Sequence, residues 1–444
     1  MFSKILIANR GEIAIRIIRA CKEMGIATVA VFSEADRDAL HVSLADESYC
    51  IGPAPAADSY LNMNGILMIA RFCGVQAIHP GYGLLSENPE FAGACGKAGI
   101  VFIGAPAEVM RRMGDKDSAR RTMRAAGVPV VPGCDLVATL EDARREAGKI
   151  GYPLLLKARA GGGRGIRRVA DEAELEPAFR AAAAEAKSAF GDGALYMEKL
   201  LTGVKHIEVQ LLCDQEGSVV CLGERDCSMQ RKNQKVIEES PAVCVSGELR
   251  KKLTETTAHA AKEAGYVGAG TIEYLLTDDG RFYFMEMNTR LQVEHPVTEM
   301  VTGVDIVKSQ IRIASGQPLG ITQNDVHIDH HAIECRINAE DPMNDYRPSC
   351  GQISLLHIPG GPNVRFDTAL YQGYTIPPFY DSMIGKLIVS AKTREDAIRK
   401  MQAALCEMVI EGVNHNAQMH IDLLCEPAFA DGSYTTDYLQ NRKA

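Results

Sequence analysis

Several features that would indicate a membrane, secreted or nucleic-acid-binding protein are missing from these 444 residues. No stretch approaches the roughly 18 consecutive apolar residues that a membrane helix needs. The first four residues run directly into the apolar residues 5–8, without a charged leader, an apolar segment and a cleavage site. The formal net charge is -9, so the chain lacks the basic excess that attracts a polyanion. We expect a cytoplasmic protein with neither membrane nor nucleic acid as a partner.

Motifs for redox chemistry and for two common nucleotide folds are also missing. The thirteen cysteines form no Cys-x-x-Cys pair, and Cys21, Cys95 and Cys406 fall within helical patterns, so we expect reduced thiols in the core. Residues 9–11 lie where a dinucleotide fold places its Gly-x-Gly-x-x-Gly fingerprint, but the full pattern is missing, which disfavours a nicotinamide enzyme. The glycine run at 161–163 is not followed by the Gly-Lys-Ser/Thr of a Walker loop.

The composition and the start of the chain predict a multidomain globular protein. Apolar residues make up 46% and charged residues 24%, and the length suggests about three domains. Strand-like stretches alternate with helical patterns over the first hundred residues, and the first helix pattern ends at Gly25. This order predicts a Rossmann-like parallel α/β domain. Tyr82 lies in a loop directly after the predicted strand 76–79, where open α/β sheets bind ligands, although a purely structural turn is about equally common.

The rest of the chain predicts a mixed central domain and a strand-rich α+β C-terminal domain. Asp171 and Glu174 form a capping-box-like start to a helix that reaches about residue 190. Residues 277–280 give a strong hairpin signal, and one helix pattern, at about 394–409, precedes a short tail. The predicted strands are 153–158, 166–170, 206–213, 270–276, 281–287, 332–337, 351–357 and 386–390. In residues 206–213, His206, Glu208 and Gln210 alternate with apolar residues, which predicts one polar face over which a ligand could lie.

The sharpest chemical signal is a run of alternating polar residues at 286–294. If this run is extended, its even-numbered side chains share one face; they are Glu286, Asn288, Arg290, Gln292 and Glu294. A solvated edge strand would also alternate, but it would usually carry Lys, Thr and Ser. Glu273 lies on the facing strand of the hairpin, so we expect Glu273, Glu286 and Asn288 to supply oxygen ligands to Mg²⁺. The alternative is a carboxylate pair neutralised by Lys or Arg neighbours.

A nucleotide site is predicted next to these carboxylates. Lys157 stands immediately before the glycine-rich loop 159–165, whose backbone N–H groups can approach phosphate because glycine has no Cβ. A lone glycine-rich loop is weak evidence. Together with Lys116, the hinge-like residues 196–201 and the predicted metal carboxylates, the loop has the recognisable layout of a nucleotide site.

With these residues in place, the whole chain resembles, from end to end, the biotin carboxylases of the ATP-grasp superfamily. The matching stretches are residues 8–12, 77–83, 113–116, 224–230, 286–299, 334–342 and 380–387. The resemblance implies an N-terminal α/β domain (1–113), an ATP-grasp domain (114–331) with a mobile lid at about 130–202, and a C-terminal domain (332–444). The chain departs from the family pattern in two places. Its glycine loop is one residue shorter and carries Arg159, and Asn233 stands where many relatives have His.

The resemblance also implies the roles of individual residues. The implied ATP contacts are Lys116, Lys157, Gly162, Gly163, Glu198, Lys199, Leu200, Leu201, His206, Gln230, Asn233, Glu273 and Glu286. Two Mg²⁺ or Mn²⁺ ions would bind Glu273, Glu286 and Asn288. Bicarbonate would contact Lys235, Arg290, Gln292, Val293 and Glu294, and biotin would contact Tyr82 and Arg336. Glu294 is the implied general base, and Lys235, Arg290 and Arg336 complete the implied catalytic set.

The implied reaction is ATP-dependent carboxylation of biotin by bicarbonate, in a homodimer, as the first half-reaction of acetyl-CoA carboxylase in fatty acid synthesis. Biotin would be carried by a separate carboxyl carrier protein and used by separate carboxyltransferase subunits, because none of the seventeen methionines here is followed by the lysine to which the family attaches biotin. Alternatives are a propionyl-CoA or pyruvate carboxylase subunit, another ATP-grasp ligase, and a non-catalytic ATP-binding subunit. The last is disfavoured because Lys235, Arg290 and Glu294 are all present.

Overall fold

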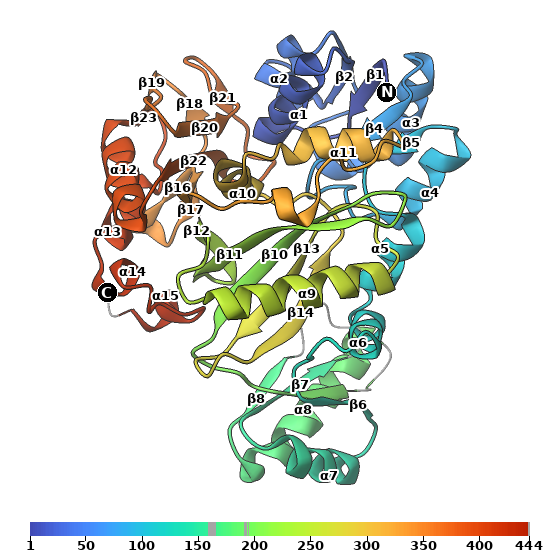
Figure 1. Cartoon of the computed structure of the whole chain (residues 1–444), viewed down its shortest axis with the longest axis vertical. Helices are drawn as coiled ribbons and strands as arrows, with labels where there is room; N and C mark the ends of the chain where they lie inside the picture. The colour runs from blue at the N-terminus through green and yellow to red at the C-terminus, as the bar shows by residue number, and fades with distance from the viewer. Residues whose placement is uncertain (159–165, 191–192, 194, 443–444) are drawn as a thin grey trace.

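A parallel five-stranded sheet forms the N-terminal part of the protein (Figure 1). The computed structural model describes residues 1–158, 166–190, 193 and 195–442. The strand order is β3-β2-β1-β4-β5, and every neighbouring pair is parallel, which confirms the predicted α/β domain. The predicted helix end is confirmed too, since Gly25 has a φ of +70° just beyond it. The elements are β1 (Lys4–Ile7), α1 (Gly11–Glu23), β2 (Ala27–Phe32), α2 (Leu40–Leu44), β3 (Glu47–Cys50), α3 (Met63–Phe72), β4 (Ala77–His79), α4 (Pro89–Lys97) and β5 (Val101–Phe102).

A small lobe at the bottom of Figure 1 follows α5 (Ala107–Gly114) and α6 (Lys116–Ala125). It contains an antiparallel sheet in the order β6-β9-β7-β8 and has its own buried apolar core between the sheet and two helices. Strands β7 and β8 pair as predicted for the two arms of the glycine-rich loop; the loop itself, with Gly162 and Gly163, lies outside the described residues. The elements are β6 (Gly133–Val137), α7 (Leu140–Ile150), β7 (Leu154–Ala158), β8 (Arg167–Val169), α8 (Glu172–Phe190) and β9 (Leu195–Lys199).

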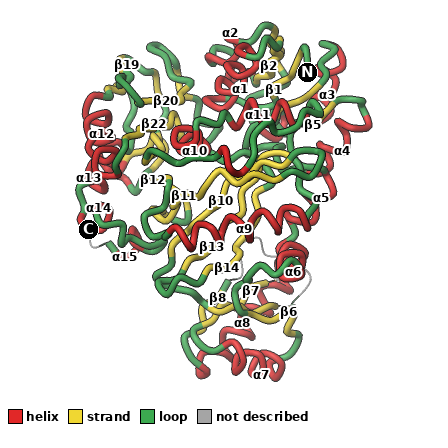
Figure 2. The backbone as a smooth tube through the Cα atoms, viewed as in Figure 1, coloured by secondary structure: helices red, strands yellow, loops and turns green. Residues whose placement is uncertain are grey.

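An eight-stranded antiparallel sheet joins the middle of the chain to its C-terminal part (Figure 2). Its order is β14-β13-β10-β11-β12-β15-β22-β20, and the predicted hairpin is β13–β14. The polar face predicted for residues 206–213 lies inside the protein, since all of β10 is buried. The elements are β10 (Lys205–Cys213), β11 (Val219–Arg231), β12 (Gln234–Ser240), α9 (Gly247–Glu263), β13 (Gly268–Leu276), β14 (Phe282–Asn288), α10 (His295–Thr302), α11 (Ile306–Ala314), β15 (His331–Asn338), β20 (Val364–Thr368) and β22 (Met383–Ala391).

The C-terminal part corrects two predictions. Residues 351–357 are not one strand, because the chain changes partner at its buried centre: the N–H of Ile353 donates to Tyr374, and that of Ser354 donates to Glu411. The tail contains three further helices, which are too short to give a clear helical period in the sequence. The remaining elements are β16 (Glu340–Asp341), β17 (Arg347–Pro348), β18 (Gly351–Gln352), β19 (Leu355–His357), β21 (Thr375–Ile376), α12 (Arg394–Glu407), β23 (Val409–Glu411), α13 (Ala417–Leu424), α14 (Pro427–Ala430) and α15 (Tyr438–Asn441).

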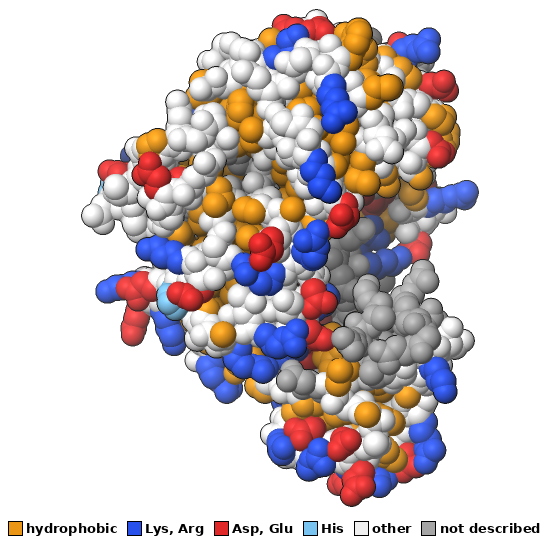
Figure 3. Space-filling view, turned by 90° about the vertical axis from the view of Figure 1, so that its right-hand side faces the viewer, with side chains coloured by type: hydrophobic (Ala, Val, Ile, Leu, Met, Phe, Trp, Pro, Cys, Tyr) orange, Lys and Arg blue, Asp and Glu red, His pale blue; other side chains and the backbone are white. Residues whose placement is uncertain are grey.

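The described residues include no helix long and apolar enough to cross a membrane. Lys and Arg side chains are interspersed with Asp and Glu on the face shown in Figure 3. All thirteen cysteines are free thiols, as expected. Cys21 and Cys95 are buried, but the prediction of a core position is wrong for the exposed Cys50, Cys244, Cys350, Cys406 and Cys425. Cys406, for example, is turned by α12 away from the buried side of the helix.

Candidate active site

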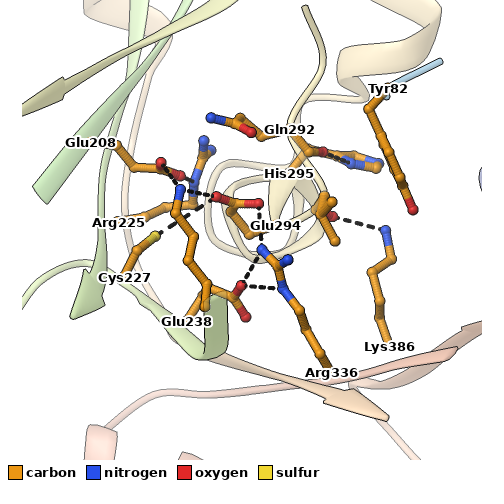
Figure 4. Close-up of polar contacts among 12 residues, drawn as sticks. Tyr82, Glu208, Arg225, Cys227, Glu238, Gln292, Glu294, His295, Arg336 and Lys386 are labelled. Atoms are coloured by element: carbon orange, nitrogen blue, oxygen red, sulfur yellow. Dashed lines mark hydrogen bonds and ion pairs between the residues drawn. The ribbon is translucent and has the colours of Figure 1, made fainter. Parts of the chain in front are cut away.

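Glu294 lies at the centre of the polar cluster in Figure 4, although not on a strand. Strand β14 ends at Asn288, and Glu294 is the N-cap residue of α10, so the prediction of an extended run through Glu294 is wrong. Pro296 fits the first turn of a helix, which explains why a helix begins directly after Glu294. The loop before α10 still brings the polar side chains together: Asn288 and Gln292 donate to Oε1 of Glu273 at 2.9 and 3.0 Å.

Glu294 is fully buried and binds two cations through its two oxygens. Its Oε1 accepts a hydrogen bond from Lys235 at 2.6 Å, and its Oε2 accepts one from Arg336 at 3.0 Å. Burial and the nearby charge of Glu208 raise the carboxyl pKa, but Lys235, Arg336 and Arg225 outweigh them, and the net pKa is below its ordinary value. Glu294 is therefore a carboxylate at neutral pH, ready to accept a proton.

Lys235 links three carboxylates. Its Nζ lies 2.7 Å from Oε2 of Glu208, 2.9 Å from Oε1 of Glu273 and 2.6 Å from Oε1 of Glu294. Burial opposes the charge, but these carboxylates hold the lysine pKa well above its ordinary value. Glu208 was not among the predicted site residues, although it lies on the polar face predicted for residues 206–213. Its other oxygen pairs with the fully buried Arg225 at 2.5 Å.

A β-bulge determines which side chains of β12 enter the site. Gln230 pairs with Lys235, but Met229 pairs with Ile237, so Val236 is an extra residue in β12. Without it, Lys235 and Glu238 would point to opposite faces, because they are three residues apart. With it, both reach the cluster around Glu294. The sequence analysis predicted no strand at residues 234–240 and did not single out Glu238, and strict alternation would have placed it away from Lys235.

Two carboxylates of the predicted metal set are direct neighbours. Glu273 and Glu286 are cross-strand partners in the β13–β14 hairpin. Glu286 has a raised pKa, first through burial and then through the charge of Glu273, which Lys116 partly offsets. On the other side, Oε2 of Glu273 lies 3.0 Å from Nε2 of His206, whose Nδ1 contacts Gln230 at 2.8 Å. Because paired carboxylates beside an Asn amide favour a hard divalent cation, the donor set fits Mg²⁺ or Mn²⁺.

The other predicted ATP-binding residues lie beside the small lobe. Glu198 on β9 pairs with Lys157 on β7 and with Arg120 on α6. Lys199 donates to the carbonyl of Tyr152 at 2.5 Å, and the half-buried Leu200 and Leu201 follow β9. Lys116 is exposed in the first turn of α6.

Asn233 is also exposed. It is the second residue of the tight β11–β12 turn, in which Lys232 and Asn233 have φ values of +50° and +64°. A type I′ turn requires positive φ at both positions and favours Asn, so the turn explains this residue type.

Tyr82 reaches the cluster from the N-terminal sheet through its partner Glu12. Glu12 accepts a hydrogen bond from the Tyr82 hydroxyl and lies 3.0 Å from Nζ of Lys386. Lys386 is fully buried and donates to the Val293 carbonyl at 2.8 Å. Sequence reasoning did not single out Lys386; a lysine within the apolar run of β22 was the available signal.

Arg290 is partly exposed, and it contacts both residues that the sequence predicted for the site and one that it did not. It donates to Oδ1 of Asn288 at 3.0 Å and to Oε1 of Gln292 at 2.6 Å, which confirms that these even-numbered side chains meet. Its Nε donates to Oε2 of Glu87 at 2.9 Å. No pattern in the sequence singled out Glu87.

Three family models match successive parts of the chain. They are the biotin carboxylase N-terminal domain (residues 1–110), the ATP-binding domain of the carbamoyl-phosphate synthase L chain (115–322) and the biotin carboxylase C-terminal domain (334–441). The fold and the cluster around Glu294 thus define an ATP-dependent ligase.

Complete proteins are similar over the whole chain. The biotin carboxylase of Haemophilus influenzae is 53% identical over 100% of this chain and 99% of its own length. A biotin carboxylase–β,γ-ATP complex from Campylobacter jejuni matches with a TM-score of 0.94 at 49% identity, covering 100% of this chain and 99% of the other. The biotin carboxylase domain dimer of Hydrogenobacter thermophilus 2-oxoglutarate carboxylase, in complex with MgADP, ADP and bicarbonate, matches with a TM-score of 0.92 at 50% identity. The match covers 99% of this chain and 97% of the other. The chain belongs to the biotin carboxylase family, and it is a biotin carboxylase by activity.

Proposed function

We propose that the cluster around Glu294 catalyses carboxylation of carrier-bound biotin by bicarbonate and ATP. The observation that carries this assignment is the buried Glu294 carboxylate held between Lys235 and Arg336. This arrangement offers a base and two fixed cations within one cluster. It fits a reaction in which bicarbonate gives up a proton, and negative charge develops on the transferring phosphoryl group and then on the ureido oxygen of biotin.

The first chemical step joins bicarbonate to the γ-phosphate. A bicarbonate oxygen attacks phosphorus, the bond to ADP breaks, and the bicarbonate proton passes to Glu294. The products of this step are ADP and carboxyphosphate. Lys235 and Arg290 hold the anionic substrate beside Glu294, together with Gln292 and the Val293 backbone. A positioned general base contributes about 10²- to 10⁴-fold.

The second step transfers CO₂ to biotin. Carboxyphosphate breaks into CO₂ and phosphate, the released phosphate takes the proton from the ureido nitrogen of biotin, and the nitrogen attacks CO₂. We propose that Arg336 stabilises the negative charge on the ureido oxygen, with Tyr82 lining the same pocket. A guanidinium suits this role because it stays charged at every relevant pH.

We propose that the nucleotide lies between the small lobe and β13–β14. Its contacts are Lys116, Lys157, Gly162, Gly163, Glu198, Lys199, Leu200, Leu201, His206, Gln230, Asn233, Glu273 and Glu286. Glu273, Glu286 and Asn288 would hold two Mg²⁺ or Mn²⁺ ions, which neutralise phosphate charge when bound. Glu198 on β9 pairs with Arg120 on α6, and Lys116 on the same helix partly offsets the raised pKa of Glu286 on β14, which supports one continuous site.

Steady-state ATP cleavage tests this function directly. ADP release from MgATP should require bicarbonate and should become faster when free biotin is added. ADP release that ignores biotin but depends on an amino acid would identify another ATP-grasp ligase. No turnover with any of these substrates, despite ATP binding, would identify a non-catalytic subunit.

We propose further that the enzyme works as a homodimer with separate partners. The carrier would bring biotin to Arg336, and carboxyltransferase subunits would use the product, with acetyl-CoA as the final acceptor. The dimeric Hydrogenobacter relative supports the assembly. For the domains we propose 1–113, 114–331 with a lid at about 130–202, and 332–444, which the three successive family matches support.

Reconstitution tests the partners. Mass spectrometry of the chain purified from biotin-fed cells should show no covalent biotin, while an added biotinylated carrier should gain a carboxyl group. With transferase subunits present, labelled carboxyl should then appear in malonyl-CoA. Label in methylmalonyl-CoA or oxaloacetate would assign the enzyme to propionyl-CoA or pyruvate carboxylation instead. Stoichiometric biotin on this chain would contradict a separate carrier.

A further inference from the structure

Arg336 lies between two buried carboxylates, and only one of them is the proposed base (Figure 4). Its Nε and Nη2 both lie 2.6 Å from Oε1 of Glu238, and its Nη2 lies 3.0 Å from Oε2 of Glu294. We propose that Glu238 is a positioning residue that holds Arg336 in place while Glu294 gains and loses a proton. This inference rests on the proposed roles of Glu294 and Arg336.

The chemistry of the first step explains why a second carboxylate is needed. When Glu294 accepts the bicarbonate proton, it becomes neutral and its charge-assisted hydrogen bond to Arg336 weakens. Arg336 must nevertheless stay in place, because the biotin charge develops immediately afterwards. Glu238 does not take part in that proton transfer and makes the two shorter contacts, so it keeps the guanidinium oriented through both steps.

The position of Glu238 favours this role over simple stabilisation. Its side chain is fully buried, and its Oε2 has no hydrogen-bond partner among the described residues. A buried ion pair often contributes little net stability, because both charges lose their hydration. The bulge at Val236 turns Glu238 toward Arg336, and bulges of this kind commonly re-aim side chains beside active sites.

The groups that face Glu238 come from several elements. They are Lys235 on its own strand, Cys227 on β11, Glu334, Cys335 and Arg336 on β15, and Glu294 at the start of α10. Burial raises the pKa of Glu238, Arg336 lowers it and the charge of Glu294 raises it, giving a pKa of about 7. Loss of the proton from Glu238 as the pH rises through 7 therefore strengthens its hold on Arg336.

The test compares Glu238→Gln with Glu239→Gln, its neighbour on the same strand. Glu239 is also buried, but it binds His331, Arg394 and Tyr434 and not the cluster around Glu294. Glu238→Gln should lower kcat of biotin-stimulated ATP cleavage by about 10- to 100-fold, the size expected for a misplaced catalytic group. Its KM for ATP should stay within about twofold, since among the described residues the hydrogen bond and ion pair of the Glu238 side chain go to Arg336 and not to a proposed nucleotide contact. Glu239→Gln should lower the melting temperature but keep kcat.

Two further measurements separate positioning from packing. In wild type, kcat should rise as the pH increases through 7, because Glu238 then becomes charged. This rise should disappear in Glu238→Gln and remain in Glu238→Asp, which keeps the charge on a shorter side chain. In an Arg336→Met background, Glu238→Gln should have no further effect on kcat. An equal loss of kcat in Glu239→Gln, an unchanged pH profile, or fully additive effects of Glu238→Gln and Arg336→Met would each overturn the inference.

These experiments distinguish failure of the proposed function from failure of the positioning role of Glu238. If wild-type enzyme shows no biotin-stimulated ATP cleavage, the proposed function is wrong. If wild type shows it and Glu238→Gln matches wild type, only the positioning role is wrong. Should Glu238→Gln fail to fold, Glu238→Asp decides alone: a reduced kcat at unchanged KM for ATP supports positioning, and a wild-type kcat overturns it.

Discussion

Replacing Glu294 with glutamine removes one negative charge from the centre of the site while keeping the shape of the side chain. The glutamine oxygen can still accept from Lys235, whose Nζ also keeps Glu208 and Glu273 as partners. Arg336 keeps Glu238 but meets an amide donor where it met a carboxylate oxygen. One lost charge-assisted hydrogen bond in a buried site costs about 1–3 kcal/mol of folding stability, so the variant should fold and melt a few degrees lower.

Catalysis should suffer far more than stability. Without the base, kcat should fall by about 10²- to 10⁴-fold, and a 10²-fold loss corresponds to about 2.7 kcal/mol in the barrier. The KM for ATP should change little, because the proposed nucleotide contacts do not include Glu294. The assay is coupled ADP release at saturating bicarbonate and biotin, with kcat and KM obtained separately.

A matched control uses another buried glutamate of the same sheet. Glu224 on β11 is paired with Arg250 and lies outside the cluster around Glu294. Glu224→Gln should therefore lower the melting temperature by a comparable amount and leave kcat unchanged. A kcat within threefold of wild type for Glu294→Gln would refute the general-base assignment, and an equal kcat loss in Glu224→Gln would show that sheet stability, not base chemistry, limits turnover.

Two further predictions concern stability and movement. Burial raises the pKa of Glu239, but His331 and Arg394 outweigh burial and bring the pKa to about 2. The folding stability that this carboxylate contributes is fully present above its pKa in the unfolded chain, roughly 4.3, and is lost as the pH falls toward 2. Arg394→Met should raise this pKa, so that circular dichroism detects acid unfolding at a higher pH than in wild type, and an unchanged acid midpoint would contradict the linkage. MgATP should slow hydrogen exchange of backbone amides in β6, β7 and β9 if the proposed lid closes, whereas unchanged exchange there would argue against a moving lid.

The sequence by itself determined the local elements and much of the chemistry. Alternating strand and helix patterns identified the parallel N-terminal sheet, and the turn at 277–280 identified the hairpin that pairs Glu273 with Glu286. These predictions succeeded because hydrophobic period and turn residues report the conformation of a contiguous segment. The resemblance to a family also singled out Lys235, Glu294 and Arg336, which the structure brings into one cluster.

Only the tertiary structure decided how distant segments meet. Glu294 is a helix N-cap and not a strand residue, and its partner Arg336 comes from a strand 42 residues later. Glu238 enters the site because β12 contains one extra residue, which no alternation rule reveals, and Lys386 reaches Val293 across 93 residues of sequence. Sequence periodicity describes which side chains share a face within one element, but strand order, register and bulges place those faces against one another, and these depend on packing of the whole sheet.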